Sequence, residues 1–385
     1  MKTGFLTLNS KLNREKAAKE ERFFDYTLLF IVIFLVLFGL VMMYSVSSYK
    51  GFTDYGDSLY YFKRQIISAG LGFVLMIVMI CMPEYVINSR LALIAYGAAV
   101  MLQAIVIMRG SSANGSVRWL YIFGFRFQPS ELAKIIVILA ASYVVSRMGR
   151  QLNKWYKILI LFLAAAPLLL LVAIENLTSA VILAVILFAI VFVAGRRYLT
   201  TVPIILIGLA GIAYMINGAA YRGSRIQAWL NVETSSSAYQ IRQALYAIGS
   251  GGVFGKGLGQ GIQKEFIPEA HTDMIFSCIC EELGIIGAVG IIILFILLMW
   301  RCIVIANNAP DLFSQLVVVG VMTHIGAQTV INIAVATNTM PNTGVTLPFI
   351  SYGGTSLMVL LAEMGLVLGV SRRIKLSRSD EEGSG

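Results

Sequence analysis

Long apolar runs separated by short polar connections recur along most of the chain. Clear examples are residues 26–47, 156–174, 180–194 and 285–300. A helix needs about 20 apolar residues to cross a bilayer, and backbone groups in lipid must be hydrogen-bonded within their own segment. The runs do not alternate between apolar and polar residues, as the strands of a membrane barrel would. The pattern therefore predicts an all-α integral membrane protein.

The hydropathy pattern predicts ten transmembrane helices. Their centres lie near residues 36, 74, 98, 139, 165, 187, 208, 288, 324 and 362. Ten crossings place both termini on one side of the membrane. The N-terminal stretch carries six Lys or Arg residues up to Arg22, and basic residues collect at the cytoplasmic ends of spans. We therefore expect both termini in the cytoplasm and the loop between spans seven and eight outside.

The same pattern divides the chain into three parts. Residues 1–25 form a basic cytoplasmic segment, residues 26–373 form the membrane domain, and residues 374–385 form a polar cytoplasmic tail that we expect to be disordered. Within the membrane domain, residues 217–273 are predicted to form a large extracytoplasmic loop. Loops longer than about 12–15 residues are usually functional, so this loop is the first candidate for the chemistry.

Composition supports a membrane protein and limits the other classes. The chain is 58% hydrophobic and 13% charged, whereas soluble domains are roughly half apolar and a quarter charged. The net charge of +10 would suggest nucleic-acid binding in a soluble protein, but basic residues at cytoplasmic span ends explain it here. No nucleic-acid partner is expected. The four cysteines lack the spacing of a zinc site and are expected to be free thiols.

Asp273 directly precedes the apolar run of the eighth span and would lie where the bilayer meets the outside. Ionisable residues at this depth are expensive and are functional candidates by default. One interpretation makes Asp273 a general base, with His271 as its orienting group. The other makes Asp273 a helix cap, and an isolated histidine is more often structural. The residues alone leave both interpretations of Asp273 open.

Four cations are predicted on the same side of the membrane as Asp273. Arg222 and Arg225 are three residues apart and would share a helix face, and Arg118 and Lys264 lie in the two external loops. Arginine suits bidentate contacts with phosphate, so a pyrophosphate ligand is one interpretation. Attraction to anionic lipid head groups is the other, and the residues do not decide between them.

The start of the fourth span carries charges close to the membrane. Gln128 and Ser130 flank a proline, which is common at the start of a helix, and Glu131 and Lys134 are three residues apart. These two charges can pair on one helix face and should face the bundle interior or a wet cavity. We expect a functional role for the pair rather than a purely structural one.

Two further patterns have simpler explanations. Gly320, His324, Gln328 and Asn332 recur every four residues along the ninth span. Small and polar residues of this kind usually hold transmembrane helices together, and we favour this over a proton path. The glycine-rich run 249–261 lacks the residues of a phosphate-binding P-loop, so we expect a close-packed or mobile external loop.

Several groups of motifs, spread from about residue 25 to residue 373, resemble the SEDS family, which includes FtsW, RodA and SpoVE. They are Asn114-Gly115-Ser116 with Arg118-Trp119, Gln128-Pro129-Ser130-Glu131 with Lys134, Tyr221-Arg222 with Arg225 and Gln240, residues 268–273, residues 281–284, and residues 341–354. Residues 268–273 and 281–284 are the most specific match. The family's Gln-Pro-Asp-Leu-Gly-Thr is replaced here at residues 174–179, which puts any role of that external turn in doubt.

The resemblance implies a ten-helix peptidoglycan glycosyltransferase of the bacterial cytoplasmic membrane that polymerises lipid II, an undecaprenyl-linked disaccharide peptide. It also implies a class B penicillin-binding protein and other divisome proteins as partners. It matches Asp273 to the family's essential carboxylate and Trp119 to an aromatic position tied to activity, and Ala270 favours the FtsW or SpoVE branch. The candidate substrate-binding residues are Arg118, Trp119, Gln128, Ser130, Glu131, Lys134, Arg222, Arg225, Lys264, His271 and Ser351.

The expected reaction is a glycosyl transfer outside the membrane. The acceptor hydroxyl attacks the anomeric carbon of the donor, Asp273 takes its proton, and undecaprenyl pyrophosphate leaves with inversion. General-base help of this kind is worth about 10²–10⁴-fold. Cations, with a divalent Mg²⁺ or Mn²⁺ ion as a further candidate, would stabilise the leaving group.

Three alternatives remain open at this point. A lipid II flippase would need a polar path through the bilayer, and the ninth span with Glu363 could supply one. A scaffold that only recruits a synthase would not need Asp273. A polymerase of the elongation type, as in the RodA branch, would use the same chemistry in another process.

Overall fold

The structure is a computed structural model that describes residues 23–82, 90–109, 111–113, 116–122, 125–149, 152, 154–195 and 220–374. Within these residues, nine helices are long and apolar enough to cross a membrane. Their positions agree with nine of the ten predicted spans. The remaining predicted span, centred near residue 208, lies outside the described residues. The chain is therefore a multi-pass helical membrane protein, as the hydropathy pattern predicts.

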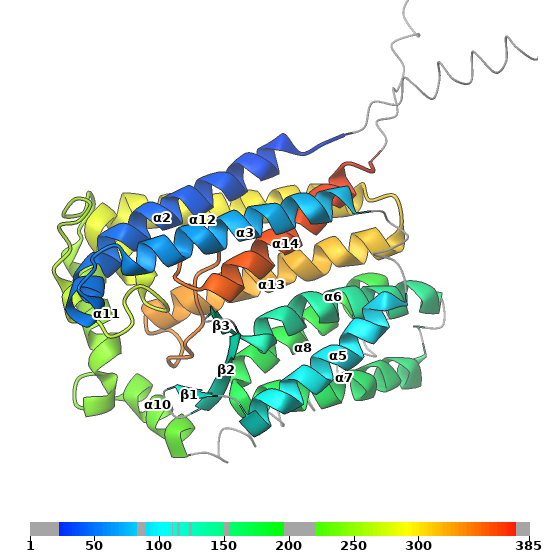
Figure 1. Cartoon of the computed structure of the whole chain (residues 1–385), viewed down its shortest axis with the longest axis horizontal. Coiled ribbons are helices and arrows are strands. Elements are labelled where there is room, and N and C mark those ends of the chain that lie inside the picture. The colour runs from blue at the N-terminus through cyan, green and yellow to red at the C-terminus, as the bar shows by residue number, and fades with distance from the viewer. Residues whose placement is uncertain are drawn as a thin grey trace, which may run out of the picture.

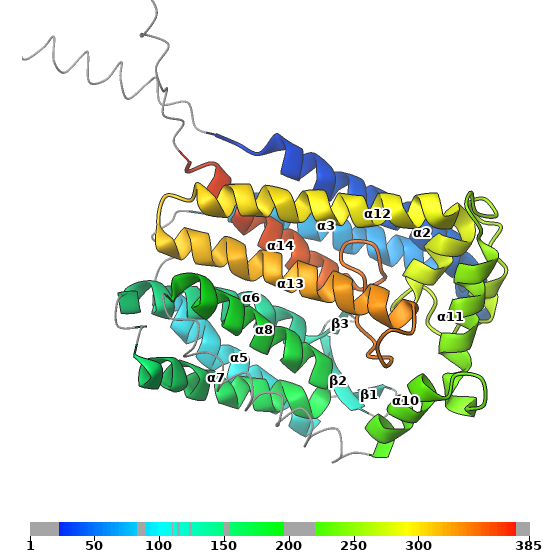
Figure 2. The same cartoon turned by 180° about the vertical axis from the view of Figure 1, so that it is seen from behind.

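The nine helices run nearly parallel to one another and form two groups (Figure 1). The first group contains α2 (Tyr26–Tyr55), α3 (Tyr60–Cys81), α12 (Ile275–Asn307), α13 (Leu312–Ala336) and α14 (Gly354–Ser371). The second contains α5 (Leu91–Arg109), α6 (Pro129–Met148), α7 (Trp155–Glu175) and α8 (Leu177–Ala194). Helix α13 joins the groups because it packs against both α6 and α8 (Figure 2).

The remaining elements gather at one end of the bundle (Figure 1). They are β1 (Ser111–Ala113), β2 (Ser116–Ile122), β3 (Phe125–Phe127), α10 (Ala220–Leu230), η3 (Ser236–Ala238), α11 (Tyr239–Ser250) and η4 (Gln263–Glu265). The strands form one antiparallel sheet in the order β1-β2-β3. The expected all-α class holds for the membrane domain, and this sheet is an addition to it. A hydropathy window as long as a span cannot resolve strands of three and seven residues.

Close helix packing in the first group depends on small residues. A Cβ atom at Gly365 of α14 would lie 2.5 Å from the carbonyl oxygen of Met76 in α3. A Cβ atom at Gly39 of α2 would lie 2.6 Å from the carbonyl oxygen of Phe349. Lipid is as apolar as the side chains, so close backbone contact at small residues is what holds such helices together.

The two ends of the described chain lie together at the opposite end of the bundle from α11. The backbone N–H of Phe23 donates to the carbonyl oxygen of Ile374 at 3.2 Å. Asp25 caps α2 by accepting from the N–H of Leu28 at 2.9 Å, and it pairs with Arg301 of α12 at 2.7 Å. These contacts fix both ends to one side of the domain.

Helix α12 is broken at Gly284, where the backbone adopts φ 67° and ψ −165°. The glycine-rich run fills the break, with the N–H of Gly257 donating to Glu282 O at 2.9 Å and Ile285 N–H donating to Gly252 O at 3.0 Å. A side chain at Gly255 would overlap the backbone at Glu282. Of the two forms expected for this run, the structure shows the close-packed one.

Candidate functional site

Asp273 lies in the turn immediately before α12 and is 8% exposed. The side chain of Asn332 in α13 holds this turn in place, because its amide nitrogen donates to Asp273 O and to Val345 O, each at 2.8 Å. The N-cap position of α12 is Met274, and no side chain caps this helix. Of the two interpretations left open by the sequence, the structure therefore does not support the helix cap.

Two side-chain groups lie within hydrogen-bonding distance of the Asp273 carboxylate. The amide of Gln240 in α11 donates to Oδ1 at 3.2 Å, and the hydroxyl of Thr272 lies 3.3 Å from the same oxygen. Gln240 also donates to Pro268 O at 2.9 Å and accepts from the amide of Asn342 at 2.9 Å. Asp273 is thus held by residues from α11 and from the segment between α13 and α14.

Burial dominates the electrostatics of this carboxylate. Desolvation and the like charge of Glu269 raise the pKa of Asp273 to about 6, against the opposing effects of its own backbone N–H, Thr272 and Arg225. Glu269 is itself paired with Lys50 of α2 at 3.3 Å. A carboxylate with a pKa near neutrality is suited to accept a proton and to release it again.

His271 is placed differently from its expected position as an orienting group. Its ring packs between the rings of Tyr61 and Tyr352, with centroid distances of 4.5 Å and 5.5 Å. Among the described contacts, none joins its imidazole to Asp273. Burial lowers the pKa of His271 to about 4, so the ring is neutral near pH 7. Its backbone carbonyl accepts from Tyr352 N–H at 2.8 Å, which ties the two segments together.

Arg225 is the candidate cation that the structure brings close to Asp273. It lies on α10 and donates to Asn342 O at 3.1 Å. Trp229, one turn further along, donates to Asn338 O at 2.9 Å. Helix α10 is therefore docked on the segment between α13 and α14, beside the carboxylate. The side chains of Arg118 and Arg222 lie outside the described residues, and Trp119 lies in β2.

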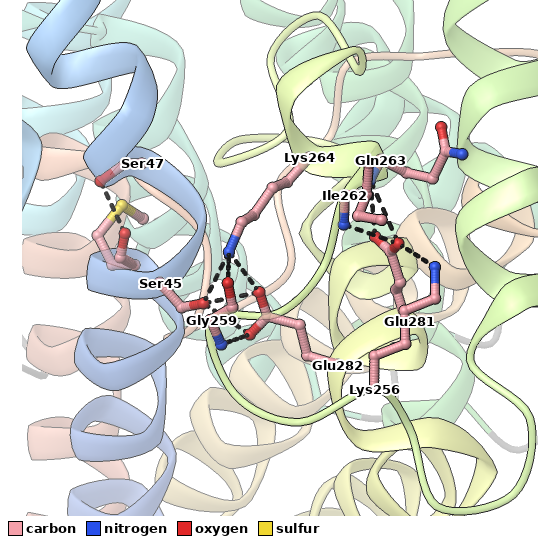
Figure 3. A network of polar contacts seen from close by, with 10 residues as sticks. Ser45, Ser47, Lys256, Gly259, Ile262, Gln263, Lys264, Glu281 and Glu282 are labelled. Carbon is pink, nitrogen blue, oxygen red and sulfur yellow. Dashed lines mark hydrogen bonds and ion pairs between the residues drawn. The ribbon is translucent and has the colours of Figure 1, made fainter.

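Lys264 has other partners than the expected phosphate. Its ammonium group lies 2.9 Å from Glu282 Oε1, 2.8 Å from Gly259 O and 3.4 Å from the hydroxyl of Ser45 (Figure 3). Glu282 is fully buried and also accepts from Ser45 and from Gly259 N–H. The charge of Lys264 is thus already neutralised, which is a physical argument against its predicted part in phosphate binding.

Glu281, the neighbour of Glu282, forms the second half of this network. It accepts from Lys256 at 2.8 Å and from the backbone N–H groups of Ile262 and Gln263 (Figure 3). Both carboxylates are completely buried. Two adjacent acids near the start of an apolar span are the sequence feature that could have indicated this network, because a buried carboxylate needs partners. Together they fix residues 256–264 to α12.

The charges at the start of α6 pair inside the bundle, as predicted. Lys134 lies 2.7 Å from Glu131 Oε1, and the two side chains are 2% and 9% exposed. A second buried pair, His324 and Glu363, joins α13 to α14 at 2.7 Å. Lys134 reaches Gln328 of α13 at 3.5 Å.

The rest of the polar stripe on α13 serves packing, as expected. Gln328 donates to Thr346 O at 3.0 Å, and Asn332, one turn further, holds the Asp273 turn. Gln128 donates to Ser130 Oγ at 3.1 Å, so both polar groups at the start of α6 are engaged with each other. The stripe thus supports the segment that follows α13 and, through Asn332, the carboxylate.

Ser351 has a structural environment. Its hydroxyl accepts from Leu347 N–H at 2.8 Å, its carbonyl accepts from Gln65 at 3.1 Å, and the residue is 5% exposed. These contacts close the turn between α13 and α14. No contact in the described residues brings Ser351 to Asp273, so its predicted part in substrate binding gains no support.

The described side chains do not offer a cluster of ligands for a divalent cation. Within the part of the chain that the structure describes, no three His, Cys, Asp or Glu side chains converge in a way that could hold a metal ion. One oxygen of Asp273 is already engaged by Gln240. The residues that the structure describes therefore form no metal site of their own.

Comparison with known proteins places the chain among relatives of similar length. A family model described as "Cell cycle protein", for FtsW, RodA and SpoVE, matches residues 26–376. Stage V sporulation protein E of Bacillus subtilis strain 168 is 36% identical over 354 residues, which is 90% of this chain and 97% of that protein. Probable peptidoglycan glycosyltransferase FtsW of Geobacter metallireducens is 36% identical over 382 residues, which is 96% of this chain and 99% of that protein.

Solved structures share the fold. A chain from a structure described as "Structural coordination of polymerization and crosslinking by a peptidoglycan synthase complex" aligns with a TM-score of 0.74 at 30% identity, covering 91% of this chain and 98% of that one. The crystal structure of Thermus thermophilus rod shape determining protein RodA aligns with a TM-score of 0.70 at 30% identity, covering 92% and 98%.

Proposed function

The chain belongs to the FtsW, RodA and SpoVE family, and from this premise we propose that it polymerises lipid II into glycan strands with Asp273 as the general base. Relatives that span nearly the whole chain are named peptidoglycan glycosyltransferases, so its reaction class is glycosyl transfer. The similarity to FtsW and SpoVE proteins favours septal or sporulation wall synthesis over elongation.

The observation that carries this proposal is the burial of Asp273 together with its raised pKa. It is the buried carboxylate of the external segment whose pKa is raised to about 6. The acceptor sugar hydroxyl attacks the anomeric carbon of the donor and gives its proton to Asp273. The bond between that carbon and the pyrophosphate oxygen breaks, and its electron pair leaves with undecaprenyl pyrophosphate. A single displacement without a covalent intermediate inverts the anomeric carbon.

Arg225 is the proposed partner of the leaving group. Its electrostatic interaction with Asp273 places its charge beside the reacting centre, and guanidinium groups bind phosphate in a bidentate manner. Charge that develops on the leaving pyrophosphate is then met by a fixed cation, which is commonly a large contribution to catalysis. A Mg²⁺ or Mn²⁺ ion would supply further positive charge for the leaving pyrophosphate, and the described residues form no cluster of His, Cys, Asp or Glu that would hold it.

The proposed setting follows from the charge pattern and the relatives. The end of the bundle with α11 faces outside the cytoplasmic membrane, both termini are cytoplasmic, and lipid II enters with its sugars at Asp273. A class B penicillin-binding protein that crosslinks the new strand is the proposed partner, together with other divisome proteins. A similar solved structure comes from a complex described as coordinating polymerization and crosslinking.

In a flippase, the buried ion pairs would supply the polar path through the bilayer. The pairs Glu131–Lys134 and His324–Glu363 lie buried inside the bundle, and Lys134 also reaches Gln328 of α13. Purified protein in detergent with lipid II separates the two functions, because a polymerase makes glycan there and a flippase does not.

The experiment that tests the proposal is a polymerisation assay with purified wild-type, Asp273→Asn and Asp273→Ala proteins, with and without a class B partner. Loss of about 10²-fold or more in both variants is expected for a general base. Lipid II binding by the variants, measured separately, shows that they are folded. Polymerisation at the wild-type rate by either variant would remove Asp273 from this role.

A further inference from the structure

We propose that Gln240 and Asn342 are positioning residues that orient Asp273 and favour its ionised form, an inference that rests on the proposed function. They come from different parts of the chain, with Gln240 on α11 and Asn342 on the segment between α13 and α14. Neither is separated from Asp273 by more than one hydrogen-bonding partner.

The direction is set at Gly344. The backbone N–H of Gly344 can only donate, and it donates to Asn342 Oδ1 at 3.2 Å. This fixes which end of the Asn342 amide is oxygen, so its NH₂ group must point the other way. That NH₂ group donates to Gln240 Oε1 at 2.9 Å.

The orientation of Gln240 follows from the same rule. With its oxygen occupied by Asn342, its NH₂ group has two protons to give. One goes to Pro268 O at 2.9 Å and the other to Asp273 Oδ1 at 3.2 Å. A reversed amide would place an oxygen against Pro268 O and against the carboxylate, and both contacts would be repulsive. The backbone N–H of Gly344, through Asn342, and the carbonyl oxygen of Pro268 both require that Gln240 presents a donor to Asp273.

The other groups around the carboxylate do not replace this donor. The hydroxyl of Thr272 has one proton and lies closer to Glu269 O, at 2.9 Å, than to Asp273, at 3.3 Å. Glu269 faces Asp273 with like charge, Arg225 faces it with opposite charge, and His271 packs against tyrosines instead. A donor that favours the carboxylate also sets the direction of its lone pairs, which is what a general base needs.

The test is the pH dependence of polymerisation by Gln240→Met, Gln240→Glu and Asn342→Ala proteins. Asp273 acts when ionised, so the rate falls on the acid side, and loss of the donor moves that fall to higher pH. We expect a shift of roughly half a unit to one unit for Gln240→Met and a larger one for Gln240→Glu, which adds a like charge. The rate loss is then several-fold greater near the acid limb than on the plateau.

Asn342→Ala isolates the orienting step, because it leaves both Gln240 and Asp273 in place. It should shift the acid limb in the same direction, and it should add no further shift in the Gln240→Met background, since the two residues act as one unit. Gln243→Met is the matched control on α11, and it should leave the profile unchanged. Thermal unfolding and lipid II binding identify any variant that fails to fold.

The outcomes separate this inference from the proposed function. Active Asp273→Asn protein overturns both. The positioning role alone is overturned if the Asp273 variants are inactive but none of the three Gln240 and Asn342 variants shifts the pH at which the rate falls on the acid side. Additive shifts from Gln240→Met and Asn342→Ala would also overturn it, because independent effects are not a relay.

Discussion

Asp273 is held in a position that opposes its own ionisation. Burial raises its pKa from the ordinary value of 3.8 to about 6, because the ionised carboxylate is less stable in this site than in water. Such environments are typical of catalytic groups. The most direct predictions about the chemistry therefore concern Asp273 and its neighbour Arg225.

The first prediction concerns pH. A general base must be unprotonated, so the polymerisation rate should rise with pH through about 6 and level off above it. Rates measured at saturating lipid II between roughly pH 5 and 8 should show this limb. A rate that stays flat across this range would mean that the ionisation of Asp273 does not control the reaction.

The second prediction concerns stability. The folded-state pKa of Asp273 lies above its unfolded value, so the folded state binds the proton more tightly, and this stabilisation is lost as pH rises from about 4 to about 6. Asp273→Asn removes the buried charge and should raise the free energy of unfolding at pH 7 by on the order of 2 kcal/mol. Thermal unfolding in detergent checks this. A lower midpoint for Asp273→Asn would contradict it.

The third prediction concerns Arg225. Charge reversal in Arg225→Glu places a negative charge beside Asp273 and the leaving pyrophosphate, so kcat/KM for lipid II should fall by roughly 10²-fold or more. Arg225→Lys keeps the charge but loses the bidentate geometry and should fall less. Lys63→Glu, at an exposed ion pair between α2 and α3, is the control. Equal kinetics for the wild type and Arg225→Glu would assign the arginine to folding or lipid contact.

The sequence singled out Asp273 through the motif at residues 268–273, because its position before a span is not distinctive: Asp25 and Asp311 also precede spans and cap them. Its supports were not predictable in this way. Gln240 lies 33 residues from Asp273 and 102 residues from Asn342. Neutral amides carry no signal of cost at the membrane surface. His271, two residues before Asp273, was the expected orienting group instead, and the structure packs it against tyrosines.

Helix α12 illustrates what hydropathy predicts at the scale of an element. The span was expected around residue 288, and the helix is present, but its break at Gly284 was not expected. Gly287 and Gly290 lie in the same helix without breaking it. Only the packing of residues 252–257 against the backbone of 280–285 distinguishes Gly284 from the others.

The fourth prediction concerns the carboxylates beside this break. Glu282→Ala leaves Lys264 buried without its ion-pair partner, and breaking a buried pair in this way typically costs about 3–5 kcal/mol. We expect a large drop in the thermal midpoint of the purified protein. Glu265→Ala, at an exposed acid in η4 of the same loop, should change the midpoint little. Similar midpoints for both variants would show that the Glu282 network does not stabilise the fold.

At the scale of the whole molecule, the sequence predicted the arrangement well because bilayer thickness constrains helix length. The nine spans of the described residues follow from that constraint, and the two described ends lie together, as the ten predicted crossings require. The sheet and α10 lie beyond the ends of the spanning helices (Figure 1), where bilayer thickness sets no length. Contacts such as Trp229 with Asn338 join residues 109 positions apart.

The fifth prediction concerns orientation. Phe254 is 81% exposed beside α11, and Trp155 is 66% exposed at the start of α7, at the opposite end of the bundle (Figure 1). In a Cys81→Ser background, a membrane-impermeant maleimide should label Phe254→Cys in intact spheroplasts and Trp155→Cys only after permeabilisation. The reverse pattern would place Asp273 in the cytoplasm and end the proposed reaction with external sugars.

The break at Gly284 also bears on how the enzyme meets membranes of different thickness. Spanning helices tilt when the hydrocarbon layer thins or swells. Because the first turns of α12 are bonded to the external loop and separated from the rest by Gly284, tilting of the long segment need not be passed to Asp273. The position of Asp273 is then expected to depend little on the thickness of the bilayer.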